Sequence, residues 1–292
     1  MRPEMRCYLN PPCLLGDFMK NSLVCARFVA VLGSLYGLTT PAWANDRHFT
    51  QSYETAVLSP GTVEVEPWTT LRLGKDSYYA GLDHRLEFEV GLTDRLQTSV
   101  YLNLGSEAVR VPGGPVAAHA TSTGISSEWK LKLSDAVADP IGSALYLELT
   151  MMAEEIEVEA KILADKRVGP WHLVTNGIYE FEHNYAEQLR EHKLQLTGGV
   201  AWFATSQVSV GLEAMSFNVL AADVGTATPG PTHFAHGALM AGPVLACSLE
   251  RGWIAVSVTP QLYGYKGALP GSNLNLAEFE QVTARVLLGV HL

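Results

Sequence analysis

Residues 83–90 read Asp-His-Arg-Leu-Glu-Phe-Glu-Val, a stretch in which polar and apolar side chains alternate. Successive side chains of a β-strand point to opposite sides, so the stretch predicts a strand with one polar and one apolar face. Arg85, Glu87 and Glu89 fall together on the polar face. The same alternation recurs at residues 126–133, 155–162 and 193–197.

Strand-like segments of this kind continue along most of the chain. They match the length of about 9–11 residues expected of a tilted membrane strand, whereas soluble strands usually run about 5–6. The predicted segments are residues 62–73, 82–92, 96–104, 124–133, 143–152, 155–164, 171–182, 192–203, 207–217, 237–249, 253–263 and 279–292.

The connections between these segments alternate in length. Short periplasmic turns and longer external loops are typical of an up-and-down membrane barrel, and they imply an even strand number with both termini on the periplasmic side. The tight connections are residues 93–95, 165–170, 204–206 and 250–252, and the long ones are residues 105–123, 219–236 and 264–278.

Aromatic residues gather at both ends of the predicted strands, as expected for side chains that settle at headgroup depth. The alternative is that they are ordinary core aromatics. The tight-turn group is Trp171, Trp202, Phe203 and Trp253, and the long-loop group is Tyr78, Tyr79, Tyr179, Phe181, Phe217, Tyr263, Tyr265 and Phe279.

These patterns predict an all-β, antiparallel up-and-down transmembrane β-barrel of about twelve strands over residues 45–292. Pro243 and Pro260 fall inside two predicted strands and disrupt a hydrogen-bond ladder, so ten or fourteen strands stay open, as does a bulge in segment 237–249. A soluble periplasmic sandwich or lipocalin-like binding protein is the alternative, because alternation alone does not say which face is inside.

Residues 1–44 have the three parts of a secretory signal peptide. Lys20 and Arg27 supply positive charge, residues 28–38 are apolar, and residues 42–44 form an Ala-Trp-Ala cleavage site. Met19 is the expected physiological start. The apolar run is shorter than the about 20 residues of a membrane helix, which argues against an anchor. We therefore expect export to the bacterial outer membrane.

Charge and cysteine content narrow the function classes. The formal net charge is −10, and removal of the net basic signal peptide makes it more negative. Such a chain lacks the basic footprint of a nucleic-acid-binding protein. Only Cys247 would remain after cleavage, so no intrachain disulfide is expected. The cysteine count does not separate a barrel from an exported periplasmic enzyme.

If the apolar faces contact lipid, the polar faces line the interior. Charges of both signs inside a narrow barrel pair with one another or stay hydrated. The sequence favours a narrow channel for small polar or cationic solutes, and a closed, salt-bridged lumen is the alternative. The candidate pore-lining residues are Arg72, Arg85, Glu87, Glu89, Glu128, Lys130, Glu157, Glu159, Lys161, Glu180, Glu182, Lys193 and Arg285.

An outer-membrane hydrolase is a weaker alternative. His183, Asn184 and His192 lie at an external loop, but no G-x-S-x-G nucleophile motif is present. His233 and His236 share a Gly/Pro-rich loop without zinc-ligand spacing. The sequence predicts no enzyme, no catalytic residue, no cofactor and no metal site.

Three stretches resemble an uncharacterised family of proteobacterial outer-membrane β-barrels, similar to the channels linked to phenol-degradation pathways. They are the Gly-Leu-Thr-Asp-Arg-Leu-Gln turn at residues 91–97, the entry segment 53–66 and residues 127–133. The resemblance implies a barrel that inserts in outer-membrane lipid and meets the barrel-assembly machinery through its C-terminal strand. That strand ends on Leu292, whereas such barrels usually end on Phe.

Overall fold

The computed structural model describes residues 46–110, 116–185, 189–221, 233–265 and 271–292. The predicted signal peptide and start at Met19 lie outside these residues. Within them no helix is long and apolar enough to cross a membrane. The described strands are β1 (Val63–Leu73), β2 (Tyr79–Gly91), β3 (Leu96–Arg110), β4 (Val116–Ser134), β5 (Gly142–Met152), β6 (Glu155–Val168), β7 (Trp171–Asn184), β8 (Leu189–Phe203), β9 (Val208–Ala221), β10 (His233–Leu249), β11 (Gly252–Gly264) and β12 (Val282–His291).

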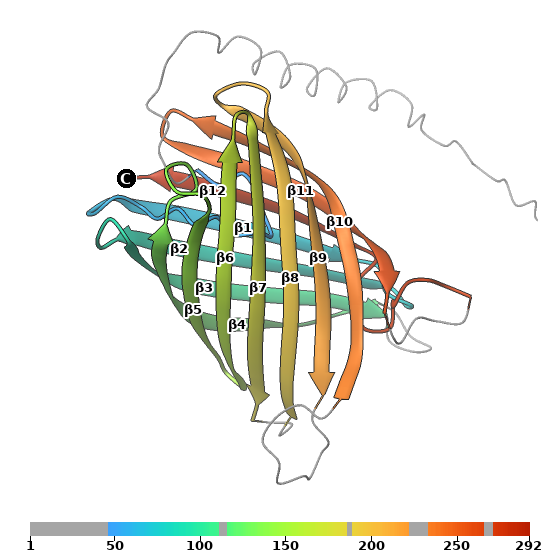
Figure 1. Ribbon diagram of the computed structural model, residues 1–292. Coiled ribbons are helices and arrows are strands. Elements are labelled where there is room, and N and C mark those ends of the chain that lie inside the picture. Colours follow the sequence, from blue (N-terminus) through green and yellow to red (C-terminus); the bar gives the residue numbers. More distant parts are fainter. Residues whose placement is uncertain (1–45, 111–115, 186–188, 222–232, 266–270) are drawn as a thin grey trace, which may run out of the picture. The chain divides into compact units, whose positions relative to one another are not determined.

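The twelve strands form one closed antiparallel barrel (Figure 1). Each strand pairs with its neighbours in sequence, and β1 pairs with β12 from Glu64 opposite His291 to Leu73 opposite Val282. Closure leaves no free sheet edge, which a strand in hydrocarbon requires because lipid cannot satisfy backbone N–H and C=O groups. The predicted up-and-down barrel of about twelve strands is confirmed.

The barrel is apolar outside and charged inside. On the outer face Leu147 is 50% exposed, Ile162 68% and Leu212 60%. On the inner face Glu87 and Glu128 are each 1% exposed. Water would favour the opposite arrangement, so the outer wall is suited to lipid. This orientation excludes the soluble sandwich and the lipocalin-like alternative.

Several strands continue beyond the predicted bounds at their long-loop ends. The prediction for β4 began at residue 124, but the strand begins at Val116, and β3 continues to Arg110 instead of residue 104. Outside the hydrocarbon region neither face needs to be apolar. Alternation is therefore lost at residues 105–110, although the backbone ladder between β3 and β4 continues there.

The two strand prolines lie in one interruption of the β10–β11 ladder. On β10, residues 238–240 and 244–249 have partners on β11, so Pro243 lies in the unpaired stretch between them. On β11, Pro260 likewise has no partner on β10 and pairs with Val282 of β12. The missing N–H groups therefore coincide with a local gap between two strands. A register shift after Leu239 shows that this segment contains the bulge that the sequence left open.

The aromatic belts are only partly confirmed. Trp171, Trp202, Tyr78, Tyr179 and Tyr263 have exposed side chains between 42% and 49% on the outer face, as belts require. Other predicted belt residues face inward: the ring centroids of Phe203 and the buried His48 lie 4.8 Å apart, and Phe279 lines an interior cavity. Trp253 is fully buried and donates to Glu64, Tyr79 is 6% exposed and donates to Glu107, and Phe217 lines an interior cavity.

The orientation of the outer wall predicts a depth-dependent cost for a charge. Leu147→Arg, in the middle of β5, is expected to lower the free energy of unfolding from lipid vesicles by about 2–4 kcal/mol. Val137→Arg, in the periplasmic turn between β4 and β5 where Val137 is 68% exposed, is the matched control. It is expected to cost about 0–1 kcal/mol. Equal costs in denaturant titrations would contradict the assignment of this face to lipid.

Candidate functional site

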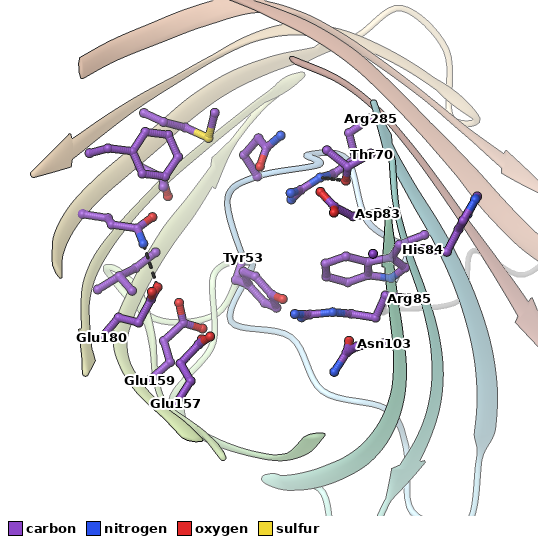
Figure 2. A pocket seen from close by; sticks show the side chains of 18 of the residues that line it. Tyr53, Thr70, Asp83, His84, Arg85, Asn103, Glu157, Glu159, Glu180 and Arg285 are labelled. Atoms are coloured by element: carbon purple, nitrogen blue, oxygen red, sulfur yellow. Dashed lines mark hydrogen bonds between the residues drawn. The ribbon is translucent and has the colours of Figure 1, made fainter. Parts of the chain in front are cut away.

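Residues 46–58, which precede β1, fold into the barrel interior and are called the plug. Residues 46–55 and Leu58 are all buried. The plug contains bends but no strand. Figure 2 shows Tyr53 on this segment in the middle of the lumen, between opposite walls. The sequence did not predict that the chain before the first strand occupies the interior.

Glu213 on β9 is the main anchor of the plug. Its Oε2 atom accepts from the backbone N–H and the hydroxyl of Thr50, both at 2.9 Å. Its Oε1 atom accepts from the N–H groups of Gln51 at 3.0 Å and Ser52 at 2.9 Å. The Glu213 side chain is buried, so these charge-assisted bonds satisfy a carboxylate that would otherwise be costly inside the barrel.

Further wall side chains pair with the plug backbone. Asn176 on β7 accepts from Tyr53 N–H at 2.7 Å and donates to the Tyr53 carbonyl at 2.8 Å. Asp165 accepts from the Thr55 hydroxyl at 2.6 Å, and Gln97 accepts from Leu58 N–H at 2.8 Å. Ser257 on β11 and Arg285 on β12 also bond Thr50, so a segment without its own hydrogen-bond ladder is held by polar side chains of six strands.

The plug also fits the wall by shape. Phe49 is fully buried, and a Cβ atom on Gly199 would lie 2.5 Å from its ring. Only glycine leaves space for this ring, so Gly199 provides a notch for the plug. On the opposite side the Arg47 guanidinium lies 4.4 Å from the Tyr53 ring centroid and 4.8 Å from that of Trp68.

Charge complementarity adds to this fit. Arg47 Nη1 lies 3.8 Å from Glu66 Oε2, beside the buried carboxylates of Glu64, Glu87 and Glu89. The plug thereby brings a positive charge to the most acidic part of the wall. Burial raises the pKa of Tyr53 to about 12, despite the nearby charges of Lys161 and Arg47, so its phenol is neutral at physiological pH.

Above the plug, on the long-loop side, the lumen opens into the outer vestibule, which consists of two overlapping cavities of about 320 and 430 Å³. Gln51 lines both cavities and Tyr53 lines one, so the plug forms part of their wall. On the tight-turn side a separate cavity of about 170 Å³ is lined by Glu54, Asp165 and His172. The plug therefore lies between the two aqueous ends of the barrel.

The outer vestibule has arginines on one side, together with Asp83, and glutamates on the other, together with Lys161 and Lys193. Figure 2 shows Arg85 and Arg285 on one side and Glu157, Glu159 and Glu180 on the other. These charges are partly paired: Arg85 on β2 lies 3.5 Å from Glu148 on β5, the register partner of Glu159, and Lys161 lies 2.7 Å from Glu159. Lys193 lies 2.7 Å from Glu180 and also contacts Glu182.

All predicted pore-lining residues carry their side chains on the inner face, but at three levels. The vestibule residues are Arg72, Arg85, Glu157, Glu159, Lys161, Glu180, Lys193 and Arg285. Glu182 lies further out through its pairing with Lys193. Beside the plug lie Glu87, Glu89, Glu128 and Lys130. Whether a solute contacts these residues stays a prediction.

The histidines considered for a hydrolase have other partners. The Tyr179 hydroxyl lies 2.6 Å from His192 Nδ1, and His183 Nδ1 lies 3.2 Å from the Leu189 carbonyl oxygen. Neither contact is with a serine. This geometry gives no support to a Ser–His arrangement at the outer rim.

Sequence reasoning missed the plug, its anchor Asn176 and the anchoring role of Glu213. Residues 46–58 carry many polar side chains without alternation, and this pattern predicts only an irregular segment that leads into the first strand. One signal was present: the pair Gly198-Gly199 inside a strand indicates that another backbone or ring approaches closely.

Residues 41–292 match the model of the family of unknown function DUF6662, so the chain belongs to that family. Among curated protein sequences none matches the chain.

Solved structures with the same fold are bacterial outer-membrane barrels. The COG4313 outer membrane channel from Pseudomonas putida F1 has a TM-score of 0.60 at 10% identity, covering 84% of this chain and 100% of that one. The β domain of the Bordetella autotransporter BrkA has a TM-score of 0.50 at 9% identity, covering 80% and 99%. Together with the apolar outer wall, this fold places the barrel in the outer membrane.

The anchor geometry predicts how the plug responds to loss of one charge. Glu213→Gln replaces an acceptor oxygen by an NH₂ group and removes the charge that faces three N–H groups. Bonds to charged groups contribute about 1.5–3 kcal/mol, so amides 50–52 are expected to exchange hydrogen about tenfold faster or more.

Mass-spectrometric hydrogen exchange of the protein in detergent measures this change. Glu250→Gln, in the turn between β10 and β11, is the matched control and is expected to leave these amides unchanged. Equal exchange in both variants would contradict the role of Glu213.

Proposed function

We propose that this protein is a narrow outer-membrane channel for small polar or cationic solutes, closed at rest by its plug. The observation that carries the proposal is the plug itself, which is held in the lumen by side-chain contacts and has a cavity on either side. A barrel with a purely structural lumen could be filled by its own wall side chains. Here a separate segment occupies the path, and it could leave without opening the wall.

The contacts of the plug suit a reversible closure. They are hydrogen bonds and ring contacts to side chains, whereas the wall is held by backbone ladders between neighbouring strands. Displacing the plug would cost a limited number of side-chain bonds and leave the barrel closed on itself. It would also expose Glu66, Glu87 and Glu89, which Arg47 faces in the closed state.

The charges inside the lumen support the solute class. An acidic surface exposed by plug release would attract cations. In the vestibule, opposed arginine and glutamate walls would align a polar solute across the path before it reaches the plug. The closed, salt-bridged scaffold is the second candidate, because many of these charges are paired with one another.

Two further predictions belong to this function. The fold is shared with a channel, and we infer that the chain works without catalysis. We also propose that the barrel-assembly machinery reads β12, whose backbone closes the barrel against β1.

A disulfide lock tests the gate. The Thr50 Oγ1 and Ser257 Oγ atoms lie 2.6 Å apart across the plug–wall contact, so Thr50→Cys with Ser257→Cys would place two thiols within bonding reach. The background is Cys247→Ser, which removes the described free cysteine. In planar bilayers we expect openings that disappear on oxidation and return on reduction, a change in conducting events of about tenfold or more.

Each single-cysteine variant serves as control and is expected to be insensitive to oxidant. Deletion of residues 46–57 is the second variant and is expected to conduct continuously. Silence of both the reduced protein and this deletion, with heat-modifiable folded barrels on gels, would overturn the channel in favour of the closed scaffold.

Ion selectivity tests the charged wall. Arg85→Ala leaves Glu148 without its guanidinium partner, so the cation-over-anion permeability ratio is expected to rise by about twofold or more. Reversal potentials in a salt gradient measure it, with the plug deletion as background. Arg251→Ala, in the periplasmic turn between β10 and β11, is the matched control. An unchanged ratio would remove Arg85 from the conducting path.

A further inference from the structure

Two plug residues and one wall residue converge on the tight-turn side of the lumen. His48 Nδ1 lies 3.0 Å from Glu54 Oε1, and His172 Nδ1, from β7, lies 3.6 Å from the same oxygen. All three residues are buried, and their three ligand atoms lie within 4.8 Å of one another. Among the described residues, this is the one such group that contains nitrogen donors, since the others consist of glutamates.

His172 has an atom that the protein itself leaves without a hydrogen bond. Its side chain is 2% exposed, and its Nδ1 is buried with no hydrogen-bond partner. That atom faces the carboxylate of Glu54. A buried ring nitrogen without a hydrogen bond is costly. This one lies within 4.8 Å of two further atoms that can bind a metal, in His48 and Glu54, so a metal ion would satisfy it.

Asp165 fixes the tautomer that makes this nitrogen a ligand. Its Oδ2 atom lies 2.9 Å from His172 Nε2, and because a carboxylate only accepts, the neutral ring carries its proton on Nε2 in this hydrogen bond. The lone pair is then on Nδ1. A carboxylate that orients a histidine in this way is the usual outer partner of a histidine bound to a metal. Asp165 is held in turn by the Thr55 hydroxyl at 2.6 Å.

The spacing fits a tetrahedral ion. With metal–ligand distances of about 2.0–2.1 Å, neighbouring ligand atoms of a tetrahedral zinc site lie about 3.3 Å apart. The separations of the two Nδ1 atoms from Glu54 Oε1, 3.0 and 3.6 Å, bracket that value, and the two Nδ1 atoms lie within 4.8 Å of each other. Two imidazoles and one carboxylate are a donor set that Zn²⁺ accepts and that Ca²⁺ or Mg²⁺, which prefer oxygen, do not.

The fourth position of such an ion has an outlet. Glu54, Asp165 and His172 line the cavity of about 170 Å³ on the tight-turn side, together with Arg167. A water molecule reaching the ion from this side would complete a tetrahedral shell.

We infer that His48, Glu54 and His172 form a zinc site that ties the plug to β7. Two ligands belong to the plug and the third to the wall, so the ion bridges the moving and the fixed part. Zinc therefore holds the closed state and its removal favours the open one. This second statement rests on the proposed plug gate, whereas metal binding does not.

Metal binding is tested first, on folded protein without a histidine tag in detergent, stripped with chelator. Titration with ZnCl₂ is expected to give one tight equivalent, and CoCl₂ to give the visible absorption of a tetrahedral centre. His172→Gln and His48→Gln are expected to weaken zinc binding beyond the about 10–100-fold that loss of an outer partner causes. Asp165→Asn, which alters only the orienting group, is expected to fall within that range.

His192→Gln is the matched control, because His192 is also buried but lies on β8, near its long-loop end, in contact with Tyr179. It is expected to bind zinc like the unaltered protein. Absence of a tight equivalent, or equal binding by His172→Gln, overturns the site. Heat-modifiable migration on gels shows that each variant is folded.

Conductance separates the two statements. Chelator is expected to increase openings of the unaltered protein about tenfold and to leave His172→Gln, which is already open, unchanged. Tight zinc binding with chelator-insensitive conductance would overturn the locking role and retain the site. If the reduced disulfide variant and the plug deletion are also silent, the gate has failed, while the zinc titration still decides the metal site.

Discussion

The whole structure depends on one constraint: every backbone N–H and C=O group in hydrocarbon must pair within the protein. The pairing of β1 with β12 meets it by closing the sheet. Once the sheet is closed, each strand side chain points either towards the lipid or into the lumen. Leu147 and Ile162 therefore face outward, and Glu87 and Glu128 face inward. Closure thus allows a charged interior, and Arg47 of the plug faces part of its negative charge.

This constraint also explains what the sequence could predict. Residues 83–90 alternate because the lipid requires it, so the strand number, the tight turns and the inward position of Arg85 and Glu159 could be predicted from local pattern. Where lipid exerts no such demand, the pattern is lost. The outer ends of β3 and β4 and the inward phase of Trp253 were missed for that reason.

The candidate site was less predictable because its residues meet only through the closed barrel. Thr50 bonds to a carboxylate 163 positions away, and Tyr53 to an amide 123 positions away. No local spacing records such contacts. His48 and His172 likewise belong to different parts of the chain, so a search for zinc-ligand spacing finds neither. The sequence predicted that charged residues line the wall. Which charges pair with one another could be seen only once the register between the strands was known.

Glu213 has a consequence for how the barrel is assembled. A slip of one residue in the pairing of β9 would turn this side chain from the lumen towards lipid. The N–H groups of Thr50, Gln51 and Ser52 would then lose their common acceptor. Since β9 is made long after these residues, the plug can settle only when most of the wall exists in its correct alignment. The plug can therefore reach this anchor only in a barrel that has closed in the correct register.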